Sequence, residues 1–265
     1  MSSSLQPEDV LEYGLIVIWE MMENQSSLLE GREGDLFAFL LRLRYCNKRN
    51  VRISKCLAIP RWIAYYAKVL EATNTIRDAL IDKTEAVYGL TTLHSCLRAF
   101  ESDPLPPETL AEWKSTSYAF GLIGLGKFIL RLPAEVLEEE LPRLKSLLIS
   151  VCFIILIYFT STYAYMQSLN DTDSLIVRES AAAVMIASQL VLRDESQLFV
   201  LLDGLSDEKK NLLTYLFDKH GARQHNGTNG MSGTDKLEKE MRRLDGRVNT
   251  PPRAKGQNWS RIEFH

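Results

Sequence analysis

Apolar side chains recur along this chain three or four positions apart, the spacing of one face of a helix. The pattern covers residues 10–22, 36–45, 69–81, 85–100, 110–132, 133–148, 175–192 and 208–219. Outside the apolar segment 147–166, no stretch shows the convincing apolar–polar alternation of a half-buried strand. The 14 Gly and 9 Pro are also too few for a sheet protein with many turns. The sequence therefore predicts an all-α fold.

Short breaks between these helices favour antiparallel hairpins stacked into an α-solenoid. In the clearest repeat signal, Asp171 stands in a turn, Val177 and Arg178 follow, and residues 181–183 are alanines. An Asp in the turn, then Val-Arg, then small residues for close contact with the previous hairpin, is typical of HEAT repeats. We expect a HEAT-repeat solenoid of antiparallel helical hairpins, in which Asp171 and Arg178 cap and bridge adjacent turns.

Charge divides the chain into two parts. Residues 222–265 carry nine basic and five acidic side chains, about +4, although the whole chain has a formal charge of −3. The first 221 residues therefore carry −7, which argues against a nucleic-acid module, since phosphate binding needs a basic face. We expect a helical domain at 1–221 and a basic, mostly disordered tail at 222–265, in which only the short amphipathic stretch 236–244 can become helical.

No group of residues assembles a catalytic or ligand-binding site. The four Cys show neither a C-x-x-C pair nor metal-ligand spacing, which indicates reduced thiols. Residues 121–127 match the start of a phosphate-binding loop, but Phe128 stands where a Ser or Thr should hold magnesium. No strand precedes this segment, so we expect Gly121 and Gly124 to admit a neighbouring helix instead. The sequence predicts no enzyme activity, no cofactor and no bound metal.

Residues 147–166 form an uncharged stretch of 20 residues. Its length and hydropathy match those of a transmembrane helix, and a single-span membrane protein anchored by 147–166 is one alternative. The second half is rich in Thr, Ser and Tyr, and the flanking sequence is that of a soluble helical repeat. These features argue against a membrane span, and an apolar helix of the solenoid is a further alternative.

A different interpretation is that two segments are translated, unspliced introns. Val151-Cys152 can be encoded by GTATGT, a common intron start, and Gln167 by CAG, a usual intron end. Removing residues 151–167 deletes 17 codons, keeps the reading frame and joins a helix to the turn that contains Asp171. The same reasoning applies to residues 51–68, where GTACGT can encode the start and AAG the end. We expect both segments to be insertions in the domain.

With these segments set aside, six stretches carry a family resemblance. They are residues 28–33, 70–78, 87–92, 118–140, 177–181 and 207–213. They resemble the C-terminal domain of the CLASP family, in its fungal form, and together they cover most of residues 10–221.

The resemblance implies a TOG-like version of the HEAT fold in a microtubule-associated protein without enzyme activity. Such proteins stabilise dynamic microtubules and support the mitotic spindle and kinetochore attachment. The implied partners are microtubules or tubulin, kinetochore or plus-end proteins and a second copy in a homodimer. The implied locations are the cytoplasm, the cytoskeleton, the nucleus and the spindle. The family's tubulin-binding TOG domains and basic linker lie upstream of this region, so contact with tubulin can be indirect.

Exposed basic side chains are the candidate contacts, because the surface of tubulin is acidic. The candidates are Arg42, Arg44, Lys48, Arg49, Lys209 and Lys210, and the basic tail would add weak, salt-sensitive affinity. The alternative is that each of these side chains is ordinary solvated surface. A solenoid adaptor unrelated to microtubules is the remaining alternative.

Overall fold

The computed structural model describes residues 7–46, 59–103, 111–139, 172–192, 194, 196, 207–219 and 232–249. The helices are α1 (Pro7–Asn24), the short 3-10 helix η1 (Ser26–Leu29), α2 (Glu33–Cys46), α4 (Ile59–Lys83), α5 (Ala86–Ser102), α6 (Ala111–Leu130), α8 (Thr172–Leu192), α10 (Asp207–Lys219) and α11 (Gly233–Val248). The described part of the chain contains no strand, so the prediction of an all-α fold is confirmed.

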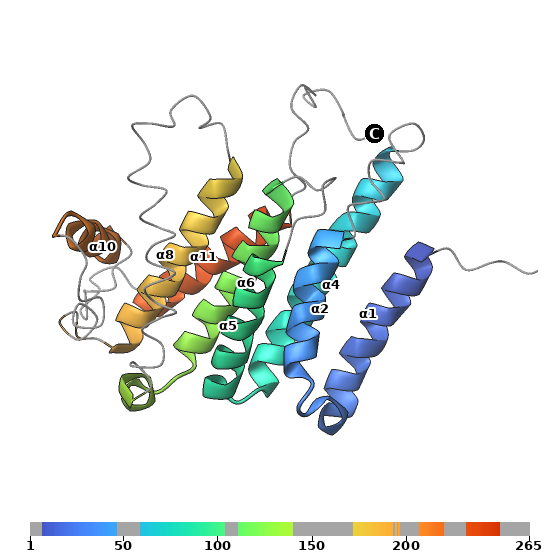
Figure 1. The fold of residues 1–265 in the computed structure, drawn as a ribbon, viewed down its shortest axis with the longest axis horizontal. Helices are drawn as coiled ribbons and strands as arrows, with labels where there is room; N and C mark the ends of the chain where they lie inside the picture. The colour runs from blue at the N-terminus through green and yellow to red at the C-terminus, as the bar shows by residue number, and fades with distance from the viewer. Residues whose placement is uncertain are drawn as a thin grey trace, which may run out of the picture.

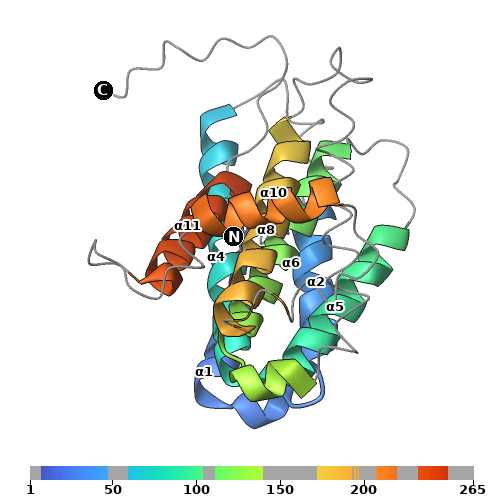
Figure 2. The same cartoon turned by 90° about the vertical axis from the view of Figure 1, so that its left-hand side faces the viewer.

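The helices follow one another along the long axis of the molecule. Helix α1 lies at one end and α10 toward the other, with α4, α2, α5, α6 and α8 between them (Figure 1). Seen along that axis, α5 lies on one side of α2, α6 and α8, and α4 and α11 lie on the other (Figure 2). The helix contacts agree, since α2 and α6 each pack against both α4 and α5, and α11 packs against α6 and α8.

Helix α6 is the centre of this arrangement. It packs against α2, α4, α5, α8 and α11, most extensively against α8. Because neighbours surround it, its side chains are buried around nearly the whole circumference, as in a helix that is apolar on all sides. The buried hydrophobic residues are Ala119, Phe120, Leu122, Ile123, Leu125, Phe128 and Ile129.

Helix α8 has the composition of a membrane span but lies within the fold. Its Leu175–Leu192 window is long and apolar enough to cross a membrane, with a mean hydropathy of 1.6. Of that window, 67% is buried inside the structure, against α6, α10 and α11. Packing in the core accounts for this apolar sequence. The expected membrane candidate, residues 147–166, lies outside the described residues.

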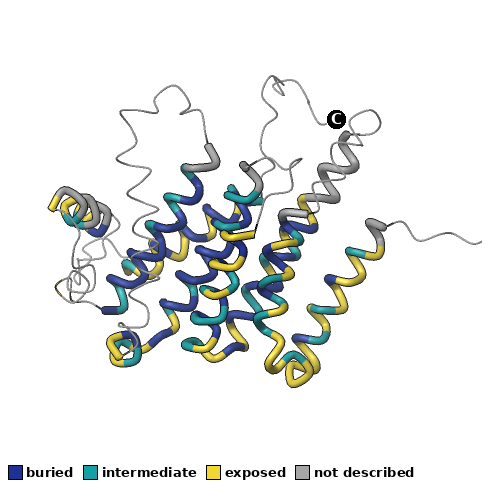
Figure 3. The backbone as a smooth tube through the Cα atoms, in the orientation of Figure 1, coloured by how far each residue is buried: buried dark blue, intermediate teal, exposed yellow. Residues whose placement is uncertain are grey.

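Helix α11 corrects the expectation of a mostly disordered tail for residues 233–248. The helix includes the stretch expected to become helical, 236–244, and is longer than that stretch at both ends. It packs against the other helices (Figure 1). Its inner face is apolar at helical spacing, and the dark-blue segments of α11 in Figure 3 mark the buried positions. These are Leu237, Met241, Leu244 and Val248, together with Asp245. The prediction relied on the basic composition of the tail and missed its apolar stripe. This stripe packs against α6 and α8.

The start of α11 is set by local sequence. The Ser232 hydroxyl accepts a hydrogen bond from the Asp235 backbone N–H at 3.1 Å, and the Asp235 carboxylate accepts one from the Ser232 backbone N–H at 3.2 Å. This reciprocal pair is a capping box, which satisfies two backbone donors that a helix start otherwise leaves open.

Of the two expected insertions, the structure describes only part of the first. Residues 59–68 of the first segment form the beginning of α4, which runs without a break into the expected helix 69–81. Residues 51–58 and the whole of 151–167 lie outside the described residues. Of the expected helix 133–148, residues 134–139 are described and are helical.

Candidate protein-interaction surfaces

Arg77 of α4 is the centre of a buried ionic cluster that joins α4, α6 and α11. Its side chain is 0% exposed and meets Asp245 of α11 through two parallel hydrogen bonds, each 2.9 Å long. The Asp78 carboxylate accepts hydrogen bonds from Nε at 2.9 Å and from Nη2 at 2.7 Å. The Phe120 carbonyl accepts the fifth, from Nη1 at 3.2 Å. All five guanidinium N–H groups thus have an acceptor, which a buried arginine requires.

Lys127 of α6 completes the cluster. Its Nζ lies 2.8 Å from both carboxylate oxygens of Asp78 and 3.1 Å from Oδ2 of Asp245. Burial alone would raise the pKa of Asp245, but the charges of Arg77 and Lys127 outweigh it and hold this pKa below its ordinary value. Burial alone would lower the pKa of Arg77, but Asp245 and Asp78 outweigh it and raise this pKa. Both groups therefore stay ionised near neutral pH.

Arg44 of α2 lies in the interior, which corrects its prediction as an exposed contact residue. It is 2% exposed, and its Nη2 donates hydrogen bonds to the Val248 carbonyl at 3.3 Å and the Asn249 side chain at 3.0 Å. A positive charge at this position stabilises the negative end of α11. Arg44 and Arg77 both lie over the ring of Phe120, at 4.3 and 4.6 Å from its centroid. The sequence showed a basic stretch but not which face of α2 each residue occupies.

The segment that matches a phosphate-binding loop packs helices together. A Cβ atom at Gly121 or Gly124 would meet leucine side chains of α5, and one at Gly126 would lie 2.5 Å from the Met241 side chain of α11. Lys127, the last residue of the match, pairs with Asp78 and Asp245. Gly121 and Gly124 therefore admit α5 to close contact with α6, as the sequence predicts for a neighbouring helix, and Gly126 admits α11.

The other predicted contact and repeat residues are spread over the molecule. Arg42 is on the surface, with its side chain 63% exposed and 3.2 Å from Asp103. Lys210 of α10 is half-buried, and Arg178 is half-buried on α8. Lys209 belongs to α10. Lys48, Arg49 and Asp171 lie outside the described residues. Among the described candidates, the structure brings no two together into one basic patch.

Helix α1 has apolar residues on more than one face. Leu15 and Met22 are buried, and Leu11 and Ile18 are partly buried beside the core. These four positions follow the i, i+4, i+7, i+11 spacing of one helix face. Five other apolar residues of α1 lie on the exposed side, where α1 forms the end of the molecule (Figure 3). They are Val10, Tyr13, Ile16, Val17 and Trp19.

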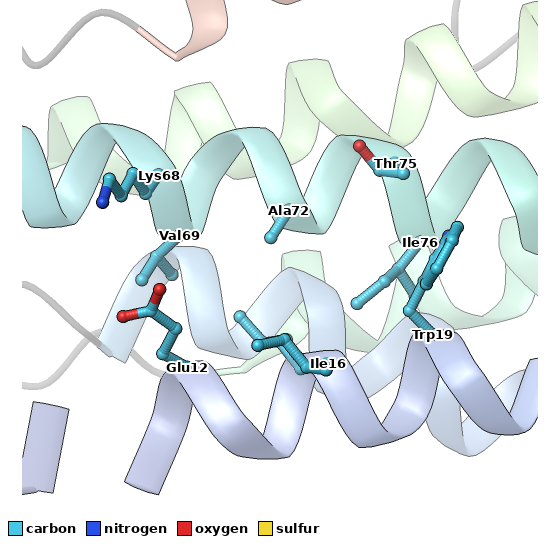
Figure 4. Close-up of a pocket in the computed structure, with 9 residues that line it drawn as sticks. Glu12, Ile16, Trp19, Lys68, Val69, Ala72, Thr75 and Ile76 are labelled. Atoms are coloured by element: carbon cyan, nitrogen blue, oxygen red, sulfur yellow. The ribbon is translucent and has the colours of Figure 1, made fainter. Parts of the chain in front are cut away.

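A groove runs between α1 and α4. Its volume is about 260 Å³, and Figure 4 shows Ile16 and Trp19 of α1 facing Ala72 and Ile76 of α4. Glu12 lies at one end of the groove, near Val69 (Figure 4). Lys68 and Thr75 of α4 also line the groove, so its lining is mainly apolar with a carboxylate and an ammonium group toward one end (Figure 4). Sequence reasoning identified α1 as amphipathic but missed its second apolar face, which the number of apolar residues in 10–22 already indicated.

The described residues contain no group of three or more His, Cys, Asp or Glu side chains that could hold a metal ion. His94 and Cys96 are both half-buried on α5. Burial, with the charge of Arg98, lowers the pKa of His94, and burial raises the pKa of the Cys96 thiol. Cys96 donates a hydrogen bond to the Gly34 carbonyl at 3.3 Å. A raised pKa leaves less of this thiol as thiolate, which is the nucleophilic form.

Two curated proteins are similar to this chain. Both are named Protein STU1, from two strains of Cryptococcus neoformans var. neoformans serotype D. Each is 24% identical over 245 residues, which cover 83% of this chain and 17% of the relative. The chain therefore spans 17% of the length of the curated relatives it matches. No family model and no solved structure matches the chain. The likeness supports a CLASP-like relationship.

Proposed function

We propose that this chain is a non-enzymatic interaction module of a CLASP-like, microtubule-associated protein. It would act by protein–protein contact, stabilising dynamic microtubules and supporting the mitotic spindle and kinetochores. The proposed partners are microtubules, contacted directly or through another protein, kinetochore or plus-end proteins and a second copy of the chain. Its proposed locations are the cytoplasm, the cytoskeleton, the nucleus and the spindle.

The observation that carries this proposal is the similarity to Protein STU1 over 83% of the chain. The arrangement of the helices supports it, because helices that follow one another along an axis present one extended face to a partner. We propose that this arrangement is a HEAT-type, TOG-like solenoid. Arg42 and Lys210 remain as described candidate contacts, with Lys48, Arg49 and Lys209 beside them.

Sedimentation with microtubules tests the direct form of the proposal. The purified chain should pellet with stabilised microtubules and should pellet less as salt rises from about 0.05 to about 0.2 M, since exposed charge contacts are screened. Replacing both Arg42 and Lys210 by Ala should lower the pelleted fraction. Arg98→Ala is the matched control, because Arg98 is exposed on α5 and is not a proposed contact.

Localisation tests the indirect form. A fluorescent fusion should lie on spindle microtubules in dividing cells and should leave them when the microtubules are depolymerised. A chain that neither pellets with microtubules nor reaches the spindle contradicts the proposal. Membrane association that resists carbonate extraction would instead support an anchor at residues 147–166.

We also propose that residues 51–68 and 151–167 are insertions into the domain. In α4, Ala67 and Lys68 are exposed, whereas Val69 and Leu70 are 3% and 2% exposed. These are the first α4 side chains that the structure describes, and the change from exposed to buried falls at the end of the first segment. Sequencing the transcript across both regions is the test. Absence of both stretches from the mature message is the expected result, and their presence contradicts it.

A further inference from the structure

The large apolar side chains that remain exposed in the described residues are concentrated on α1. Tyr13 is 62% exposed, Val10 58%, Val17 55% and Ile16 49%. Val10, Tyr13 and Val17 are three and four residues apart, so they form one stripe along the helix. Single exposed apolar residues are ordinary, but a continuous stripe marks an interaction surface.

Packing among the described residues does not account for the stripe. The face of α1 that includes Leu15 and Met22 already packs on the core. Ile16 and Trp19 continue the stripe into the groove against α4 (Figure 4). An amphipathic helix laid along α1 could place apolar side chains both on the stripe and in this groove, as in helix-in-groove recognition.

The charge of α1 determines what kind of helix fits. Its 18 residues include five acidic side chains and no Lys or Arg. Lys83 pairs with Glu23 at 2.9 Å. Among the described residues, Glu12 and Glu20 have no ion-pair partner, and both are exposed beside the apolar stripe. On α1 the surface is therefore apolar with exposed acidic side chains, and Lys68 of α4 is the basic residue among those that line the groove.

Charge also argues against a second copy of α1 as the occupant. Two α1 helices side by side would bring ten carboxylates together with no basic residue from either helix, and like charges at an interface oppose association. A partner helix with basic residues beside its apolar face would instead bring positive charges next to the acidic side chains of α1, which favours association.

We propose that the outward face of α1 and the α1–α4 groove bind an amphipathic helix with a basic border, supplied by another protein. This inference refines the proposed function by naming the class of partner. Apolar contacts along Tyr13, Val17 and Ile16 supply the affinity, and Glu12 and Glu20 select for basic side chains. The buried face of α1 is unchanged by binding.

The probe is a synthetic helical peptide of about 18 residues, the length of α1, with a leucine stripe bordered by lysines. A second peptide carries glutamates in place of the lysines, and a third carries serines in place of the leucines. Fluorescence anisotropy with the full chain measures binding. The leucine–lysine peptide should bind at least tenfold more tightly than either control peptide, which corresponds to a difference in binding free energy of about 1.4 kcal/mol.

Variants of α1 locate the site. Replacing both Tyr13 and Val17 by Ser should weaken binding of the leucine–lysine peptide about tenfold or more, because both exposed anchors are lost. Replacing both Glu12 and Glu20 by Lys should weaken it similarly and should remove most of its salt dependence. Tyr215→Ser is the matched control, since Tyr215 of α10 is 60% exposed, and it should leave binding unchanged.

Three results would overturn the inference. They are equal binding of the lysine and glutamate peptides, binding that the α1 variants do not change, and no binding at all. Self-association that Tyr13→Ser abolishes would also overturn it, in favour of a second copy as the occupant. A negative peptide result leaves the microtubule proposal in place. Failure in the sedimentation and localisation tests removes that proposal and leaves the peptide result.

Discussion

Helices α1 and α11 are both amphipathic, but the fold treats their apolar faces differently. The stripe of α11 is buried against α6 and α8, and Asp245 joins it to Arg77 and Lys127. Helix α1 buries one apolar face and exposes another. At α11 the apolar stripe is buried against the core. At α1 only one of two apolar faces packs against the core of the described residues, and the other is exposed.

The nature of the contacts differs as well. Asp245 anchors α11 to a fully buried arginine, and such an anchor is costly to break because it leaves a charge without its partner. The ion pair of α1, between Glu23 and Lys83, is partly exposed and contributes little. We therefore expect substitutions at α11 to change stability and substitutions on the outward face of α1 to change binding.

The largest expected effect is that of Asp245→Ala. It leaves Arg77 buried with one carboxylate partner fewer and should lower the free energy of unfolding by about 3–5 kcal/mol. Chemical denaturation followed by circular dichroism measures it. Glu238→Gln on the exposed side of α11 removes only the surface pair with Arg242 and should cost less than about 0.5 kcal/mol. Equal effects of the two changes would contradict a buried anchor.

Acid should weaken the same contact to a smaller extent. The pKa of Asp245 is below its ordinary value of about 3.9 in the folded state, so its ion pairs stabilise the fold fully above about pH 4. That contribution is lost as pH falls through the lowered folded pKa. Stability measured from about pH 6 down to about pH 2 should fall less steeply for Asp245→Asn than for the unaltered chain. Parallel profiles would show that Asp245 does not titrate with folding.

Gly126→Val should cost about 2 kcal/mol, because its side chain would occupy the space of the Met241 methyl group. Adding Met241→Ala should recover part of that loss, and a double-mutant cycle of unfolding free energies measures the coupling. Gly246→Ala is the matched control on the open side of α11, where an added Cβ meets nothing within 4 Å. It should stabilise the helix by about 0.5–1 kcal/mol. Additive effects at positions 126 and 241 would contradict close packing of α11 on α6.

The smallest expected effect on stability is that of Tyr13→Ser on α1. Tyr13 is exposed, so the change should shift the free energy of unfolding by less than about 0.5 kcal/mol. Leu15→Ala, on the buried face of the same helix, should cost about 2–5 kcal/mol and serves as the comparison. Thermal or chemical unfolding of both variants measures the difference. A large loss at Tyr13 would mean that the stripe belongs to the core.

Local sequence determined the helices and several of their ends. The spacing of apolar residues in 10–22, 36–45, 85–100 and 208–219 predicted helices that the structure contains, because one helix face must be apolar to pack. The capping box at Ser232 and Asp235 also sets a helix start from local sequence, although the sequence analysis did not identify it. The glycines at 121 and 124 could be recognised as points of close helix contact, although not which helix they admit.

The tertiary structure decided which charges are buried. Arg42 and Arg44 stand two residues apart on α2, yet one side chain is 63% exposed and the other residue is 2% exposed. Residues two apart on a helix point in different directions, and only the positions of α4, α6 and α11 determine which direction is inward. The partners of Arg77 and Arg44 on α11 are separated from them by more than 160 residues in the sequence. Local patterns specify the helices, whereas contacts at such separations depend on how the helices pack.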